Sequence, residues 1–190
     1  HLKHKLKKSR QEVKRISLDA ASYALDHGLV VEFSAEDATR TDPAFLRELL
    51  SAAVKEGAQR VCVCDTVGVL TPERANELFS KLTKIVKVPV AAHCHNDFGM
   101  GTANTLAAVK AGAQEVHVTV NGLGERGGNA ALEEVVLALA HFHEIKTGVK
   151  LNKLYSISKL VERNTGLPVS PTKAVVGENA FTHEAGIHTH

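Results

Sequence analysis

A twelve-residue pattern that occurs twice constrains the fold of this chain more than any other feature. The segments AAVKEGAQRVCV (52–63) and AAVKAGAQEVHV (107–118) are identical at nine of twelve positions. Each reads as the end of an alanine-rich helix, a glycine that stops the helix, and a valine-rich strand. A looser copy surrounds Gly28, and IVKVPVAAHCH (85–95) supplies another strand without the glycine. Helix and strand therefore alternate, as they do in βα units around a parallel sheet.

The repeat predicts where the elements lie. We expect strands at about 29–34, 60–65, 88–93 and 115–120, and helices at about 8–26, 43–57, 72–85, 101–111 and 130–146. Asp42-Pro43 and Thr71-Pro72 are each typical of a helix start, with an N-cap followed by proline. The fold class is α/β. About four βα units could form an open doubly wound sheet or half of an eight-unit barrel.

The composition narrows the class of protein. The chain has 190 residues, of which 44% are hydrophobic and 4% aromatic, so its core is aliphatic, as parallel sheets require. A net charge of +2 gives no reason to expect a nucleic-acid partner. We see no membrane segment and no signal peptide, and we expect a cytoplasmic protein. Cys62 and Cys64 share one face of a strand. Small buried residues are the favoured interpretation, and a redox or metal pair is the alternative.

Polar side chains collect where the expected strands end. Period-two alternation puts Glu32, Ser34 and Glu36 on one face of the first strand and apolar residues on the other. Asp65 and Thr66 follow the second strand. The fourth strand carries a polar set on one face as well, formed by His117, Thr119 and Asn121. The active site of a (β/α)8 barrel lies at the carboxyl ends of its strands, so in a barrel these polar side chains would line the active site.

His93 and His95 end the third strand. Alternation points both imidazoles to the same side, about 6–7 Å apart. This arrangement suits two ligands of one ion, and imidazole favours Zn²⁺, Mn²⁺, Fe²⁺ or Co²⁺ over Ca²⁺. Two ligands are too few, so a carboxylate or amide must come from elsewhere. The alternative, two histidines that merely end a strand, stays open.

Two further segments carry unusual residues. The glycines of NGLGERGGN (121–129) could cradle a phosphate in front of a helix from Ala130, or form an ordinary loop. GENAFTHEAGIHTH (177–190) has three histidines in its last eight residues and could equally be a polar tail.

Five segments together resemble a known family. They are FSAEDATRTD (33–42), CDTVGVLTPE (64–73), HCHNDFGMGTANTLAAVKAGA (93–113), VTVNGLGERGGNAALEEV (118–135) and VVGENAFTHEAGIH (175–188). In this order they are similar to the 2-isopropylmalate, homocitrate and citramalate synthases. These are metal-dependent TIM barrels, related to HMG-CoA lyase, that condense acetyl-CoA with a 2-oxo acid.

The resemblance implies how the chain is organised. Residues 1–148 would be the C-terminal half of a TIM (β/α)8 barrel, and residues 149–190 the start of a helical C-terminal subdomain. The family's Arg-Asp-Gly motif, which supplies a catalytic arginine and a metal-binding aspartate, belongs to the first half and is absent. The chain begins with His and not Met. We therefore expect a piece of a longer protein, inactive when isolated.

The resemblance also implies site residues. His93 and His95 would bind a divalent metal (Zn²⁺, Mn²⁺ or Mg²⁺), with Asn129 as a further ligand or close neighbour. Glu36 resembles the acid that works with a catalytic histidine, and His188 resembles that histidine, which comes from the neighbouring subunit of a homodimer. The oxo-acid carboxylate would bind at Thr66, with Ser34 and Glu32 also facing the substrate. Acetyl-CoA would lie beside Gly122, Gly124 and Glu125.

The choice of oxo acid rests on one position. Homocitrate synthases tend to carry arginine where this chain has Glu32, and Glu32 would repel a second carboxylate. We expect 2-oxoisovalerate, hence leucine biosynthesis, with pyruvate and then 2-oxoglutarate as alternatives. A lyase on the same barrel is a further alternative, against which the segment GENAFTHEAGIH argues.

Overall fold

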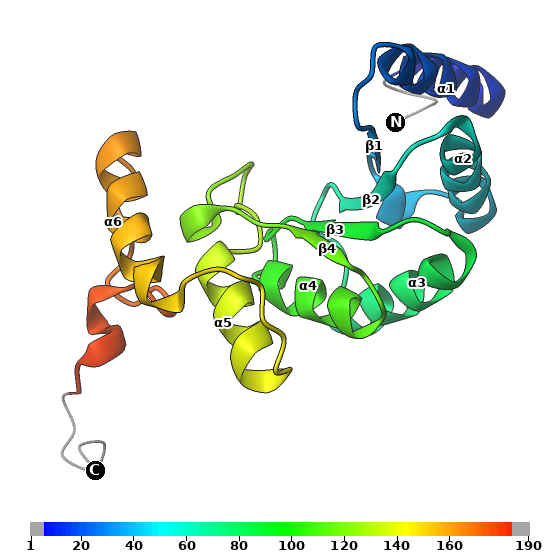
Figure 1. Cartoon of the computed structure of the whole chain (residues 1–190). Coiled ribbons are helices and arrows are strands. Elements are labelled where there is room, and N and C mark those ends of the chain that lie inside the picture. Colours follow the sequence, from blue (N-terminus) through cyan, green and yellow to red (C-terminus); the bar gives the residue numbers. More distant parts are fainter. Residues whose placement is uncertain (1–5, 184–190) are drawn as a thin grey trace.

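The computed structural model describes residues 6–183 and contains one sheet of four parallel strands (Figure 1). The strands are β1 (Glu32–Ala35), β2 (Arg60–Asp65), β3 (Val90–Cys94) and β4 (Glu115–His117), and they pair in chain order. The helices are α1 (Arg10–Asp26), α2 (Pro43–Glu56), α3 (Pro72–Ile85), α4 (Gly101–Lys110), α5 (Leu132–Phe142) and α6 (Leu154–Thr165). Short 3-10 helices are η2 (Ala38–Arg40), η3 (Val120–Gly122), η4 (Leu151–Lys153) and η5 (Glu178–Phe181).

The helices cover one face of the sheet. Figure 1 shows α3, α4 and α5 on the same side of β3 and β4. Apolar strand residues such as Val61, Val63 and Val90 are buried against this helical layer. The opposite face carries Glu32 and His117. A doubly wound sheet would have helices on both faces, so the one-sided cover confirms part of a barrel.

The four strands and five helices expected from the sequence are present and differ only at their ends, whereas α6 was not among the expected helix ranges. Asp42 Oδ1 accepts a hydrogen bond from Phe45 N at 2.9 Å and Thr71 Oγ1 from Arg74 N at 3.4 Å, which confirms both predicted N-caps. The fourth strand ends at His117 and not near 120, because Asn121 (φ 62°) lies in η3. The predicted place of Asn121 on the polar strand face is therefore wrong. Its Nδ2 donates to Ser158 O at 3.1 Å instead.

Both copies of the repeat form the same turn. Gly57 and Gly112 follow α2 and α4 with φ of 120° and 101°, which glycine adopts without strain. In the second copy, Gln114 N donates to Val90 O at 3.1 Å, while its side-chain Oε1 accepts from Val90 N at 3.0 Å. Gln59 makes the same pair of bonds to Val31. Each glutamine thus holds both backbone groups of a residue at the start of the neighbouring strand.

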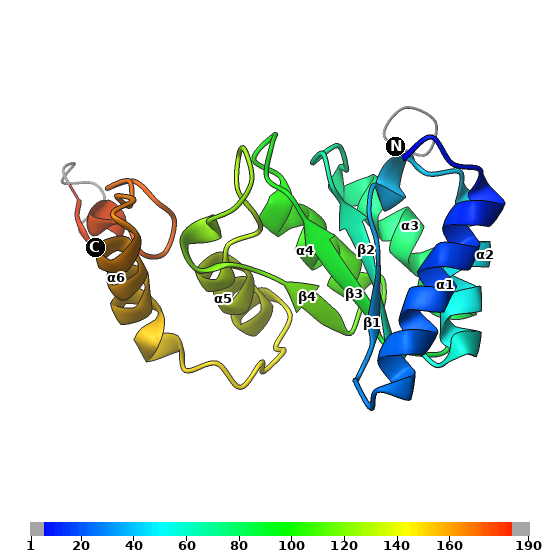
Figure 2. The same cartoon turned by 90° about the horizontal axis from the view of Figure 1, so that it is seen from above.

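The C-terminal segment is anchored to the sheet domain. Leu154 and Val176 are buried, and Lys173 pairs with Glu133 and Glu134 of α5. Figure 2 shows α6 at the opposite end of the molecule from α1 and α2. The domain boundary at 148/149 stays a prediction. Among residues 6–183, no helix is long and apolar enough to cross a bilayer.

We predict that Gln114→Ala lowers the midpoint of urea unfolding by an amount equivalent to about 1–3 kcal/mol. The substitution leaves the N–H of Val90, a residue only 1% exposed, without its acceptor. Gln114→Glu keeps an acceptor at this position and is the matched control. Equal losses in both variants would show that the hydrogen bond to Val90 is not what the glutamine contributes.

Candidate metal centre

The loops that follow the strands meet beside His93 and His95. His95 forms an isolated antiparallel bridge with Asn129, and Asn96 N donates to Gly128 O at 2.8 Å. Ala130 N donates to Cys94 O at 3.0 Å. These bonds hold the glycine loop 121–129 against the end of β3, so a residue far along the chain reaches the two histidines.

The buried carboxylate of Asp65 organises the same edge of the sheet. Its Oδ1 accepts from Thr39 Oγ1 at 2.9 Å and from Val69 N at 3.1 Å, and its Oδ2 accepts from Leu70 N at 3.0 Å. Asp65 is fully buried, and these donors satisfy both of its oxygens. The loops after β1 and β2 are thereby fixed relative to each other.

The hydrogen-bond partner of His95 determines which of its ring nitrogens carries the hydrogen. His95 Nδ1 lies 3.2 Å from the backbone oxygen of Asp65. A carbonyl oxygen only accepts hydrogen bonds, so Nδ1 carries the hydrogen and Nε2 of the neutral ring has a bare lone pair. Metal-binding histidines commonly show this arrangement, with the second ring nitrogen bonded to a backbone carbonyl.

His93 is half-buried and lies between two other imidazoles. Its ring centroid is 5.0 Å from that of His95 and 5.4 Å from that of His117. Its Nδ1 is 3.3 Å from Nδ1 of His117. Burial, followed by the neighbouring His95 and His117, lowers the pKa of His93. The ring is therefore neutral at pH 7, which is the form that binds metals.

Asn129 contributes an oxygen with no partner. Its Nδ2 donates to Leu123 O at 3.1 Å, which orients the amide. Its Oδ1 is buried and makes no hydrogen bond within the described structure. A buried polar atom without a partner is costly, and an ion would satisfy it. Two imidazoles and one amide oxygen fit the donor set of a Zn²⁺, Mn²⁺ or Co²⁺ site. The metal role of these three residues stays a prediction.

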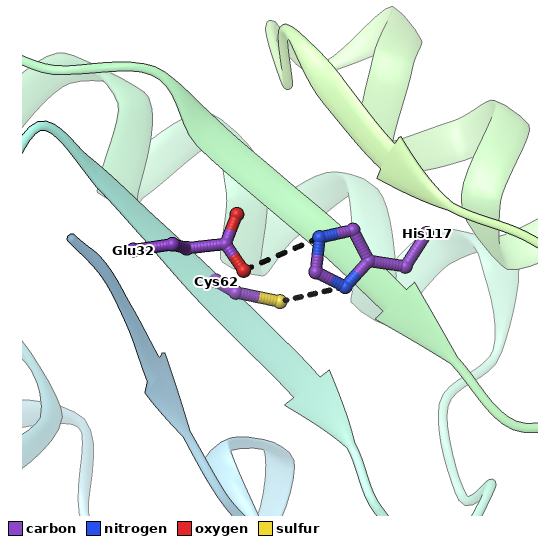
Figure 3. Close-up of side chains that lie close together, drawn as sticks. All are labelled: Glu32, Cys62 and His117. Carbon is purple, nitrogen blue, oxygen red and sulfur yellow. Dashed lines mark hydrogen bonds and ion pairs between the residues drawn. The ribbon is translucent and has the colours of Figure 1, made fainter. Parts of the chain in front are cut away.

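Glu32, Cys62 and His117 form a second compact group on the uncovered face of the sheet (Figure 3). Their candidate ligand atoms lie within 4.8 Å of one another. Cys62 Sγ is 3.7 Å from Nδ1 of His117, whereas the Glu32 carboxylate is 3.3 Å from Nε2. The thiol and the carboxylate thus lie at different nitrogens of the His117 ring, whose lone pairs point in different directions. One ion therefore cannot bind between His117 and both of these side chains. Contact with Cys64 and burial raise the pKa of the Cys62 thiol, which stays protonated. We therefore interpret the group as a polar network.

The predicted substrate residues lie at the ends of β1 and β2. Thr66 Oγ1 accepts from Asp37 N at 2.7 Å, which leaves its own hydrogen available for a carboxylate. Ser34 Oγ donates to Glu32 at 3.3 Å. Glu36 is exposed and directly follows β1. His188 lies outside the described residues. The roles predicted for all of these residues stay predictions.

Contacts within the glycine loop explain why glycine occurs at two of its positions. Gly122 N donates to Thr119 O at 3.0 Å, so this N–H serves the turn and not a phosphate. A Cβ on Gly124 would lie 2.2 Å from Nδ2 of Asn129, so Gly124 makes room for that amide. Glu125 is exposed beside them. The predicted acetyl-CoA contacts of Gly122, Gly124 and Glu125 stay predictions.

Sequence reasoning missed a clamp between three loops. Arg126 Nε donates to Asp97 Oδ1 at 2.6 Å, and its Nη2 donates to Asp97 Oδ2 at 2.9 Å and to Thr66 O at 2.8 Å. Gly68 is required beside it, because a Cβ there would lie 2.3 Å from Asp97 Oδ2. The guanidinium of Arg126 lowers the pKa of Asp97. The only sequence signal for this contact was that Asp97 and Arg126, which carry opposite charges, each follow a predicted strand.

The comparisons with known proteins identify the family. The HMGL-like family model matches residues 1–161, so the chain belongs to the HMGL-like family. It is 59% identical to the (R)-citramalate synthase of Methanocaldococcus jannaschii over 188 residues, which are 99% of this chain and 38% of that protein. It is 56% identical to the 2-isopropylmalate synthase of the same organism, over 100% of this chain and 37% of that protein.

The solved structures give the same result for the fold. An HMG-CoA lyase of Bacillus subtilis superposes with a TM-score of 0.74 at 26% identity, covering 87% of this chain and 59% of that chain. The resemblance to the acetyl-CoA-condensing synthases and their HMG-CoA lyase relatives is thus confirmed. The chain spans about two fifths of the length of these curated synthases.

We predict that Arg126→Lys loosens the glycine loop. Lysine cannot make the paired bonds to Asp97 or reach Thr66 O at the same time, so loop 121–129 should exchange its amide hydrogens faster. Hydrogen–deuterium exchange measures this change. Arg15→Lys, at an exposed ion pair with Asp19 on α1, is the control. Unchanged exchange in the Arg126 variant would show that the clamp does not order the loop.

Proposed function

We propose that the full-length protein containing this chain condenses acetyl-CoA with a 2-oxo acid, using a divalent metal held by His93, His95 and Asn129. The arrangement of His95 carries this proposal: its Nδ1 is occupied by the Asp65 carbonyl, which leaves Nε2 as a ligand beside the orphan oxygen of Asn129. High identity to two synthases, whose names each denote the product of acetyl-CoA and a 2-oxo acid, supports the reaction type.

The residues of this chain would share the work as follows. The bound ion would act as a Lewis acid toward the ketone of the oxo acid. Thr66 would donate its hydroxyl hydrogen to the carboxylate of that acid, because its oxygen already accepts from Asp37 N. His188, oriented by Glu36 and supplied by the neighbouring subunit of a homodimer, would take a proton from the acetyl methyl group. Clamped by Arg126, the glycine loop would lie beside the thioester.

The chemistry balances with these parts alone. Removal of a methyl proton gives an enolate, whose carbon attacks the ketone carbon and forms the new C–C bond. The ketone oxygen takes up a proton and becomes an alcohol. Water then cleaves the thioester C–S bond, which yields a carboxylic acid and the thiol of CoA. No oxidant or reductant is required.

The identity of the oxo acid is the finer part of the proposal. Glu32 faces the open side of the sheet with a side chain 23% exposed, and its charge disfavours a substrate with a second carboxylate there. This supports 2-oxoisovalerate or pyruvate over 2-oxoglutarate. The relatives divide between citramalate and 2-isopropylmalate synthases at nearly equal identity. We therefore propose both 2-oxoisovalerate and pyruvate as candidate substrates. A role in leucine biosynthesis applies only if the substrate is 2-oxoisovalerate.

We predict different losses in two histidine variants of the full-length protein. His93→Ala should lose both bound metal and condensation activity, because the ligand itself is removed. His188→Ala should keep its metal and lose activity, because only the proton transfer is affected. Metal content by atomic absorption and CoA release by a thiol reagent measure the two properties. Full activity in His188→Ala would refute its assigned role.

The direct test of the function is CoA release by the full-length protein with divalent metal. Acetyl-CoA is offered with 2-oxoisovalerate, pyruvate or 2-oxoglutarate in separate assays. Release with one acid establishes condensation and selects the substrate. No release with any acid, in folded and metal-loaded protein, would exclude the synthase and favour the lyase alternative that the HMG-CoA lyase fold allows. The isolated 190-residue chain should be inactive in each assay, since it spans only about two fifths of the length of its synthase relatives.

A further inference from the structure

We propose that Glu32 and His117 are positioning residues that fix the tautomer of His93, so that its Nε2 is a bare metal ligand. The inference rests on the proposed metal role of His93 and adds two residues that do not touch the ion. It assigns a role to the polar group in Figure 3, of which the proposed reaction otherwise uses only Glu32, in the choice of oxo acid.

The first step concerns Glu32 and His117. The carboxylate oxygen of Glu32 lies 3.3 Å from Nε2 of His117, and the same oxygen also accepts from Ser34 Oγ. An ionised carboxylate can only accept hydrogen bonds. The hydrogen of a neutral His117 ring therefore lies on Nε2, where it faces the negative charge. If the hydrogen were on Nδ1 instead, the lone pair of Nε2 would face the lone pairs of the Glu32 carboxylate and repel them.

The second step passes from His117 to His93. With its hydrogen on Nε2, His117 has a bare Nδ1, which lies 3.3 Å from Nδ1 of His93. One of two facing nitrogens must donate, so the hydrogen of His93 lies on its Nδ1. The weak S–H donor of Cys62, 3.7 Å from the same Nδ1 of His117, is consistent with an acceptor there. Nε2 of His93 is consequently bare.

The two histidines of the H-x-H pair thus reach the same state through different partners. Nδ1 of His95 donates to the backbone carbonyl of Asp65, and Nδ1 of His93 donates to another imidazole. Outer partners of this kind fix the ring orientation and increase the basicity of the ligand. The sheet register builds the network, because His93 and His117 are direct partners in the β3–β4 pairing. Glu32 comes from β1, at the other edge of the sheet.

The experiment titrates the full-length protein with Co²⁺ alone and follows the visible absorption of the bound ion, without substrate. His117→Phe keeps a ring of similar size but removes the acceptor, and should weaken Co²⁺ binding by about 10- to 100-fold. His117→Asn places an oxygen acceptor where Nδ1 was, and should bind Co²⁺ close to the affinity of the unaltered protein. Circular dichroism confirms that each variant is folded.

A matched pair of carboxylate variants tests the remote end of the network. Glu32→Ala should weaken Co²⁺ binding, because the His117 ring is then free to take the other tautomer. Glu115→Ala should not, since the Glu115 carboxylate pairs with Arg60 at 3.0 Å and, within residues 6–183, bonds to neither histidine of the network. Both residues are strand glutamates with similar partial exposure, so general charge effects are matched.

The outcomes separate this inference from the proposed function. Unaltered Co²⁺ affinity in His117→Phe, equal losses in His117→Phe and His117→Asn, or equal affinities in Glu32→Ala and Glu115→Ala would each overturn the positioning role. Failure of the unaltered protein to bind Co²⁺, or unchanged binding in His95→Ala, would instead overturn the metal site itself.

Discussion

The candidate site depends on the buried residue at the end of β2. Asp65 holds the loops after β1 and β2 with its carboxylate, and its backbone oxygen accepts the hydrogen of His95. Each buried backbone N–H that lost its bond to this carboxylate would lower the free energy of unfolding by about 1–3 kcal/mol, so movement of the loops away from Asp65 is unfavourable. One residue therefore couples the packing of the strand ends to the tautomer of a proposed ligand.

The uncovered face of the sheet is unusual for a barrel interior. Such interiors are dominated by branched aliphatic side chains, yet here Glu32 and Cys62 lie beside His117, which in turn contacts His93. Polar groups at such positions are stable only when they bond to each other, and the network satisfies this condition. In the proposed tautomers, the same bonds leave the lone pair on Nε2 of His93 without a hydrogen, which is what a metal ligand requires. Stability and the proposed function thus draw on the same contacts.

The sequence predicted those features that depend on local pattern. The repeat located the strands, and alternation placed His93 and His117 on the polar face. Five ordered segments were enough to predict the family, which the HMGL-like match confirmed. The choice between an open sheet and a barrel required the observed positions of the helices, because both folds share the same alternation of elements.

The remaining features depend on contacts between distant residues. The pairing of His93 with His117 follows from the β3–β4 register, which no local pattern specifies. The bond from the Asn121 side chain to Ser158 O forms only where α6 packs against η3. The clamp of Arg126 on Asp97 joins loops that are 29 positions apart in the chain. These positions are where tertiary structure, and not propensity, decides the geometry.

The central claim is that the strand ends present two bare Nε2 atoms to one ion. Anomalous X-ray scattering from crystals of the full-length protein loaded with Zn²⁺ tests this claim most directly. The account predicts a single strong peak about 2.0–2.1 Å from Nε2 of both His93 and His95, with Oδ1 of Asn129 next to it. A peak bonded to Cys62 or to Nδ1 of His117, with none at His93 and His95, would contradict the account.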